Sequence, residues 1–164
     1  MASLDHDEIP RAAPKLTVSR AIPVWLRARR PWVTYGLVTA NVVVAVLGSF
    51  LASPGDEGFA VSLGQHRGAV WHGEYWRLLT GPFLHAGVWH LGMNMLVLLL
   101  LGRFVERIQG HALFAWTYGL TGLSGALFFQ VFSRDTLGIG ASGAVYGVLG
   151  AFLVIVSALR RRRR

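Results

Sequence analysis

The sequence predicts an all-α, polytopic membrane protein built as a bundle of transmembrane helices. Its 164 residues are 53% hydrophobic and only 15% charged, whereas a soluble domain usually carries about 25% charged residues. The apolar residues gather in four runs close to the roughly 20 residues that a helix needs to cross a hydrocarbon core. These runs are near-continuous rather than alternating, so helices, and not a barrel, are expected to satisfy the backbone polar groups in lipid.

The chain begins with a polar tail, residues 1–31, which we expect to be flexible and cytoplasmic. Its first nine residues carry three acidic side chains and no basic ones, so they do not resemble the n-region of a signal peptide. The first apolar run, about Trp32 to Ala52, contains no charge and is the first predicted span.

A loop of about 30 residues, from Ser53 to roughly Leu84, separates the first two spans. Loops this long are usually functional or disordered. This one is rich in aromatic side chains, which settle at membrane interfaces and favour order: Trp71, Tyr75, Trp76 and Phe83.

Three further spans are predicted at about Val88–Phe104, Ala112–Phe132 and Gly140–Leu159, and a basic end follows at 160–164. Of the 16 Lys and Arg residues, six lie in the tail, two between the second and third spans and five at the C-terminal end. Only three lie in the other two links. By the positive-inside rule both ends should be cytoplasmic and the long loop extracytoplasmic. We therefore expect an integral protein of the plasma (inner) membrane, with residues 32–159 in contact with membrane lipids.

Composition also excludes some functions. The net charge of +8 could indicate nucleic acid, but the positive residues flank apolar runs and no aromatic residues are interleaved with them, as a nucleic-acid groove would require. We therefore expect no nucleic-acid partner. The absence of cysteine excludes a disulfide framework, a thiolate metal site and a cysteine nucleophile.

A serine lies where the fourth span begins, in Gly140-Ala141-Ser142-Gly143. A helix N-terminus supplies free N–H groups that can bind a developing oxyanion, so Ser142 is a candidate nucleophile. Helix packing is the alternative, since Gly143, Gly147 and Gly150 share one stripe of the helix. From this motif alone, packing is the favoured interpretation.

His90 and Asn94 lie one helical turn apart in the second span and so share a face. Polar side chains within a span usually face the protein interior. Their N–H groups could polarise a carbonyl, or could form hydrogen bonds that hold helices together, and the two interpretations are equally supported. A metal site is disfavoured because His85 and His90 point in different directions and no carboxylate lies nearby.

Taken together, the polar motifs resemble the rhomboid family in order, spacing and membrane context over about residues 35–159. The motifs that carry the resemblance are Trp76-Arg77-Leu78-Leu79-Thr80, Phe83-Leu84-His85, His90, Asn94, Gly102-Arg103-Phe104-Val105-Glu106, Gly140-Ala141-Ser142-Gly143 and Tyr146.

The resemblance implies a partial rhomboid bundle and an intramembrane serine endopeptidase that cleaves peptide bonds in or near the transmembrane segments of membrane-protein substrates. It makes Ser142 the nucleophile and places His90 and Asn94, with the Ser142 N–H, in the oxyanion hole. It implies no metal and no cofactor.

Supporting roles follow from the same resemblance. Tyr146 would lie under the catalytic imidazole, His85 would support the site, and Gly140 and its neighbour Gly143 would allow close backbone approach. The resemblance gives structural roles to Trp76 and Arg77 in the loop and to Glu106 at the cytoplasmic end of the second helix. For Glu106, a solvated end charge beside Arg103 and Arg107 is an equally supported alternative.

The sequence departs from the family in one respect. Rhomboids use a Ser–His dyad whose histidine comes from the sixth helix of the core, whereas all six histidines here precede Ser142. A serine without a base is a weak nucleophile, so we expect little activity from the chain as written. Either it is part of a protein with two more helices, or it is a non-catalytic rhomboid-like protein that binds client transmembrane helices. The intact nucleophile pattern favours the first.

Overall fold

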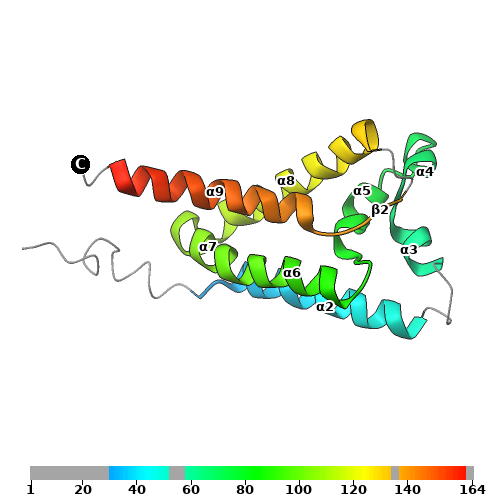
Figure 1. Ribbon diagram of the computed structural model, residues 1–164, viewed down its shortest axis with the longest axis horizontal. Helices are drawn as coiled ribbons and strands as arrows, with labels where there is room; N and C mark the ends of the chain where they lie inside the picture. The colour runs from blue at the N-terminus through cyan, green and yellow to red at the C-terminus, as the bar shows by residue number, and fades with distance from the viewer. Residues whose placement is uncertain (1–29, 52–57, 134–136, 162–164) are drawn as a thin grey trace, which may run out of the picture.

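Four long apolar helices form the body of the protein (Figure 1). The computed structural model describes residues 30–51, 58–133 and 137–161. Most of the expected tail and the last three arginines therefore lie outside the described residues. The helices long and apolar enough to cross a membrane are α2 (Trp32–Leu51), the continuous helix Val88–Gln109, α8 (His111–Phe132) and α9 (Ser142–Arg161). The predicted all-α, polytopic bundle is thus confirmed.

The helix bounds differ from the expected ones by a few residues. The second helix continues to Gln109, five residues past the expected Phe104, and α9 continues through Arg160 and Arg161. Long arginine side chains can reach the interface while their backbone stays helical, so charge alone did not end α9.

The second span consists of α6 (Val88–Val97), the π-helical turn η3 (Leu98–Gly102) and α7 (Arg103–Gln109). The wider turn coincides with close packing, because a Cβ on Gly102 would lie 3.1 Å from Thr34 Oγ1 and 3.2 Å from Phe114. Gly110, with φ of 85°, then ends α7 and allows α8 to begin at once.

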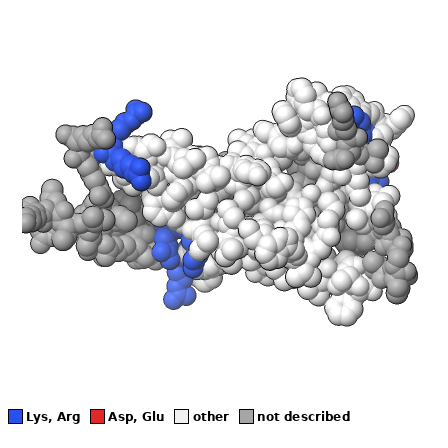
Figure 2. Space-filling model, in the orientation of Figure 1, with Lys and Arg blue, Asp and Glu red and all other residues white. Residues whose placement is uncertain are grey.

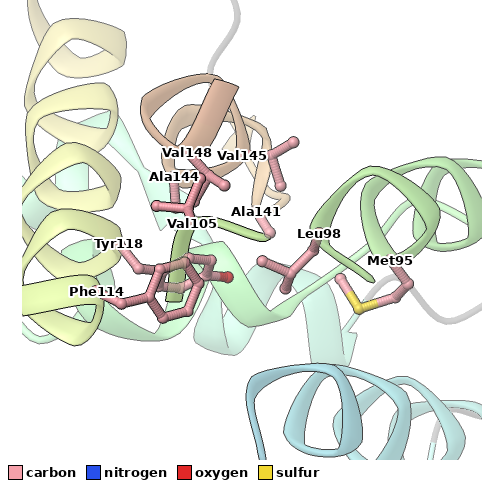
Figure 3. Close-up of a cluster of buried hydrophobic side chains, with 9 residues drawn as sticks. All are labelled: Met95, Leu98, Val105, Phe114, Tyr118, Ala141, Ala144, Val145 and Val148. Carbon is pink, nitrogen blue, oxygen red and sulfur yellow. The ribbon is translucent and has the colours of Figure 1, made fainter. Parts of the chain in front are cut away.

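The core lies where α6, α7, α8 and α9 meet (Figure 3). Phe114 and Tyr118 of α8 point towards Val105 of α7 and the first turns of α9, and Leu98 packs beside Ala141. The buried apolar cluster is Met95, Leu98, Val105, Phe114, Tyr118, Ala141, Ala144, Val145 and Val148. The start of α9 is therefore fixed by side chains from three other elements.

The link between α2 and α6 is folded into short elements at one end of the bundle (Figure 1). They are α3 (Gly58–Leu63), β1 (Gln65–His66), α4 (Arg67–Trp71), α5 (Arg77–Thr80) and η2 (Gly81–Phe83). Strand β1 pairs antiparallel with β2 (Leu137–Gly138), with Gln65 opposite Gly138. The sequence had predicted only helices, and this ladder ties the loop to the segment that leads into α9.

Most of the long helices' surface is apolar and exposed, as lipid contact requires. In α8, for example, Trp116 is 66% and Phe132 67% exposed. Arginine side chains gather towards the end of the bundle where α7 lies and α9 finishes (Figure 2). Of the described arginines, only Arg67 and Arg77 belong to the folded loop at the other end.

Candidate active site

Ser142 is the first residue of α9, a 20-residue helix, and its side chain is exposed. The first N–H groups of a helix have no partner within it and carry the positive end of the helix dipole. Ala141, directly before it, is fully buried in the core. The hydroxyl is therefore held at a fixed point beside free backbone donors.

His90 of α6 lies directly against the turn that precedes Ser142. Gly140 has φ of +115°, a conformation that side chains rarely adopt. A Cβ at this position would lie 2.6 Å from His90 Cε1 and 2.8 Å from Nε2. Only glycine therefore lets the imidazole approach this backbone, and the structure brings His90 close to the turn that holds Ser142.

Asn94 lies one turn further along α6 and is buried, with 7% of its surface exposed. Its Nδ2 donates a hydrogen bond of 2.9 Å to the carbonyl of His90. A carboxamide nitrogen has two N–H groups, so one donor remains for another acceptor. Asn94 thus both fixes its own rotamer within α6 and retains a free N–H.

His85 packs against His90 in an edge-to-face arrangement, with ring centroids 5.1 Å apart. Both of its ring nitrogens are buried and make no hydrogen bond of normal geometry with any described residue. Burial lowers the pKa of His85 below its ordinary value, and the nearby His90 lowers it further, while the Phe83 carbonyl opposes the shift. The ring packs against His90 on one side and lines a second cavity together with residues of α2.

Ser142 lines a cavity of about 770 Å³ between α8, α9 and the folded loop. Tyr146, one turn after Ser142, also lines it and is 72% exposed. Gln65, which no sequence motif singles out, reaches the same cavity from β1. No local pattern marks this glutamine, because its proximity depends on the pairing of β1 with β2.

The glycine stripe of α9 divides between packing and open space. A Cβ on Gly143 would lie 3.1 Å from the Cα of Gly125, and one on Gly147 would overlap the side chain of Thr121. Nothing lies within 4 Å of the corresponding point on Gly150. Close contact with α8 therefore involves Gly143 and Gly147 but not Gly150.

Of the five histidines in the described part of the chain, none forms a hydrogen bond with Ser142. His66 and His72 are exposed in the loop, and His111 lies at the start of α8, bonded to Glu106. The described residues thus supply a hydroxyl and N–H donors but no base in contact with the hydroxyl.

A family model for the rhomboid domain matches residues 72–164, more than half of the chain. The chain belongs to the rhomboid family.

Curated rhomboid relatives differ in reported activity. The chain is 33% identical to rhomboid protease GluP of Bacillus subtilis over 133 residues, which are 80% of this chain and 26% of that protein. It is 39% identical to putative rhomboid protease YdcA of the same bacterium over 88 residues, 53% of this chain and 44% of YdcA. It is also 39% identical to inactive RHOMBOID-like protein 8 of Arabidopsis thaliana over 80 residues, 49% of this chain and 23% of that protein. The chain spans less than half the length of these relatives.

In this rhomboid domain Arg77 ties the folded loop together. Its guanidinium donates to the Val61 carbonyl at 2.7 Å and the Gly64 carbonyl at 2.9 Å, and its Nε pairs with Glu74 at 2.6 Å. The ring of Trp76 stacks on the same group, 4.7 Å away. Arg77 is only 9% exposed, so these contacts join α3 to α5 from within the loop.

Glu106 is buried rather than solvated, with 1% of its surface exposed. Its carboxylate accepts hydrogen bonds from the backbone N–H groups of Val33 and Thr34, at 2.9 and 2.8 Å, and from the Thr34 hydroxyl at 2.6 Å. His111 Nδ1 lies 2.6 Å from Glu106 Oε1, the same oxygen that accepts from Val33. The alternative of a solvated end charge is therefore wrong, because the carboxylate holds the start of α2 against α7 and α8.

Proposed function

We propose that this chain carries the nucleophile of an intramembrane serine endopeptidase that cleaves peptide bonds in or near the transmembrane segments of other membrane proteins. One observation carries the proposal: an exposed serine begins α9, directly after a glycine turn against which the His90 ring is packed. Small neighbours leave room for an acyl group, and free helix N–H groups favour an oxyanion.

In the proposed reaction Ser142 attacks the carbonyl carbon of the scissile bond. The oxygen becomes negatively charged and accepts hydrogen bonds from the Ser142 N–H, the His90 ring and the free N–H of Asn94. Removal of one such donor typically lowers the rate about 10²–10³-fold. The proton of Ser142 must pass to a base that the described residues do not hold in contact with it.

The proposed setting is the plasma (inner) membrane, with the N-terminus cytoplasmic and the folded loop outside. Tryptophans 71 and 76 are exposed on that loop, and such residues favour the membrane interface. Water would then reach Ser142 from the extracytoplasmic side through the cavity that this residue lines.

The test is the protein expressed from its complete gene, purified in detergent and given a transmembrane substrate together with a fluorophosphonate that labels activated serines. Cleavage and labelling are expected, and Ser142→Ala should abolish both. Cleavage that survives Ser142→Ala would contradict the assignment of the nucleophile.

A second candidate function is client binding without cleavage. Two observations favour it: no histidine among the described residues forms a hydrogen bond with Ser142, and one relative is named as inactive. This function predicts that wild-type protein is not labelled by the fluorophosphonate. Crosslinking to a transmembrane client should then be the same in wild type and Ser142→Ala.

A further inference from the structure

Gln65 is a buried polar side chain next to the candidate nucleophile. It is 5% exposed and belongs to β1, where it pairs with Gly138, four residues before Ser142. Gln65 and Ser142 line the same cavity. No other glutamine among the described residues lines this cavity.

The side chain is held in place by a glycine. A Cβ on Gly81 would lie 2.6 Å from Gln65 Cγ and 2.9 Å from its Nε2, so the glutamine occupies the space that any side chain at position 81 would need. The Gly81 carbonyl accepts a hydrogen bond of 3.1 Å from the N–H of Gly140. Gln65 is therefore linked, through one glycine, to the turn that positions His90 and Ser142.

The carboxamide of Gln65 lacks a partner for its oxygen. Oε1 is buried and accepts no hydrogen bond from the described residues. An unpaired buried acceptor destabilises the folded state, and an apolar side chain of the same shape would avoid that cost. Much of the cavity wall is apolar and comes from Phe128, Phe129 and Phe132, so packing alone would be satisfied by an apolar side chain at position 65.

We propose that Gln65 determines specificity: its Oε1 accepts a hydrogen bond from a donor on the substrate side chain that enters the cavity beside Ser142. The inference rests on the proposed function.

The last side-chain torsion of glutamine is soft, so a small rotation turns Oε1 into the cavity. A site built to bond a hydroxyl discriminates against the isostere that lacks it, because the acceptor is then left unpaired. Substrates with serine at this position are therefore preferred over those with alanine.

Binding tests the proposal without turnover. In the Ser142→Ala background of the protein expressed from its complete gene, we would measure the affinity of paired transmembrane peptides that differ by Ser or Ala at one position, moved stepwise along the peptide's outer third. With Gln65 present, about tenfold tighter binding of the serine peptide is expected at one position. Gln65→Met should bring the two affinities together.

Gln130→Met is the matched control. Gln130 is also buried, at 4% exposure, and both of its amide atoms lack partners among the described residues, but it does not line this cavity. It should retain the tenfold preference. If Gln65→Met does not fold, Gly81→Ala replaces it, because the new methyl displaces the Gln65 side chain and should abolish the preference in the same way.

Equal affinities for every peptide pair with Gln65 present would overturn the proposal, and so would a preference that survives in a folded Gln65→Met. A different result would contradict the proposed protease function, namely that protein with Ser142 restored does not cleave a transmembrane substrate. The binding preference that depends on Gln65 could still be observed in that case.

Discussion

Individual buried polar side chains carry most of the functional information in this chain, and each is positioned by a contact distant in sequence. His90 reaches the backbone of Gly140, 50 residues later, and Gln65 fills the space left by Gly81. In both pairs the polar side chain occupies the space that a side chain on the glycine would need. His85 is enclosed in a similar way, since both of its ring nitrogens are buried and make no hydrogen bond of normal geometry with a described residue.

The lowered pKa of His85 predicts acid sensitivity. The unfolded chain takes up a proton on this ring near its ordinary pKa of 6.5, whereas burial and His90 make the folded protein bind that proton less readily. Below this pH the unfolded state therefore binds more protons, and stability should fall as pH falls. Thermal unfolding in detergent should show a melting temperature that is constant above neutrality and drops below about pH 6.5.

A variant series isolates the ring responsible. His85→Asn should weaken this pH dependence, whereas His72→Asn, at an exposed loop position, should preserve it. An unchanged acid dependence in folded His85→Asn would show that another group causes it.

At the scale of elements, the start of α2 depends on a side chain from α7. The N–H groups of Val33 and Thr34 have no partner within their own helix, and the buried Glu106 carboxylate accepts from both. A negative charge at this position also complements the helix dipole. One carboxylate thus fixes the first span against the second and, through His111, the third.

Glu106→Ala should therefore destabilise the protein by about 3–5 kcal/mol, since it leaves two buried N–H groups and a hydroxyl without an acceptor. Glu74→Ala is the matched control, because that carboxylate is 44% exposed and bonds only Arg77 among the described residues. Its loss should cost about 1 kcal/mol or less. Denaturant unfolding followed by circular dichroism measures both, and equal losses would contradict the capping role.

The four long helices could be predicted from sequence because each is recognised from its own run of about 20 apolar residues, without knowledge of its contacts. Ser142 and its glycines were likewise visible as a local motif. The strands β1 and β2 were not, because two residues per strand leave no alternation to detect. Gln65 and the burial of Glu106 were also beyond local patterns, since each depends on contacts across 16 or more residues.

At the scale of the whole molecule, most of the described arginines lie at one end of the bundle, and the folded loop lies at the other. Arg103, Arg107 and Arg161 belong to the end where α7 and α9 finish, while the folded loop with Trp71 and Trp76 lies beyond the start of α9. Positively charged residues near the ends of spans favour the cytoplasmic side of the membrane. Because the four long helices alternate in direction along the chain, one orientation fixes the side of every link.

This arrangement predicts a specific labelling pattern in cells. The chain contains no cysteine, so single cysteines can be introduced without a background. A cysteine at the exposed His72 of the folded loop should react with a membrane-impermeant maleimide in intact cells. A cysteine at the exposed Arg107, on the other side, should react only after the membrane is permeabilised. The reverse pattern would invert the proposed topology and place the cavity beside Ser142 on the cytoplasmic side, and labelling of both sites in intact cells would contradict a bundle with separated ends.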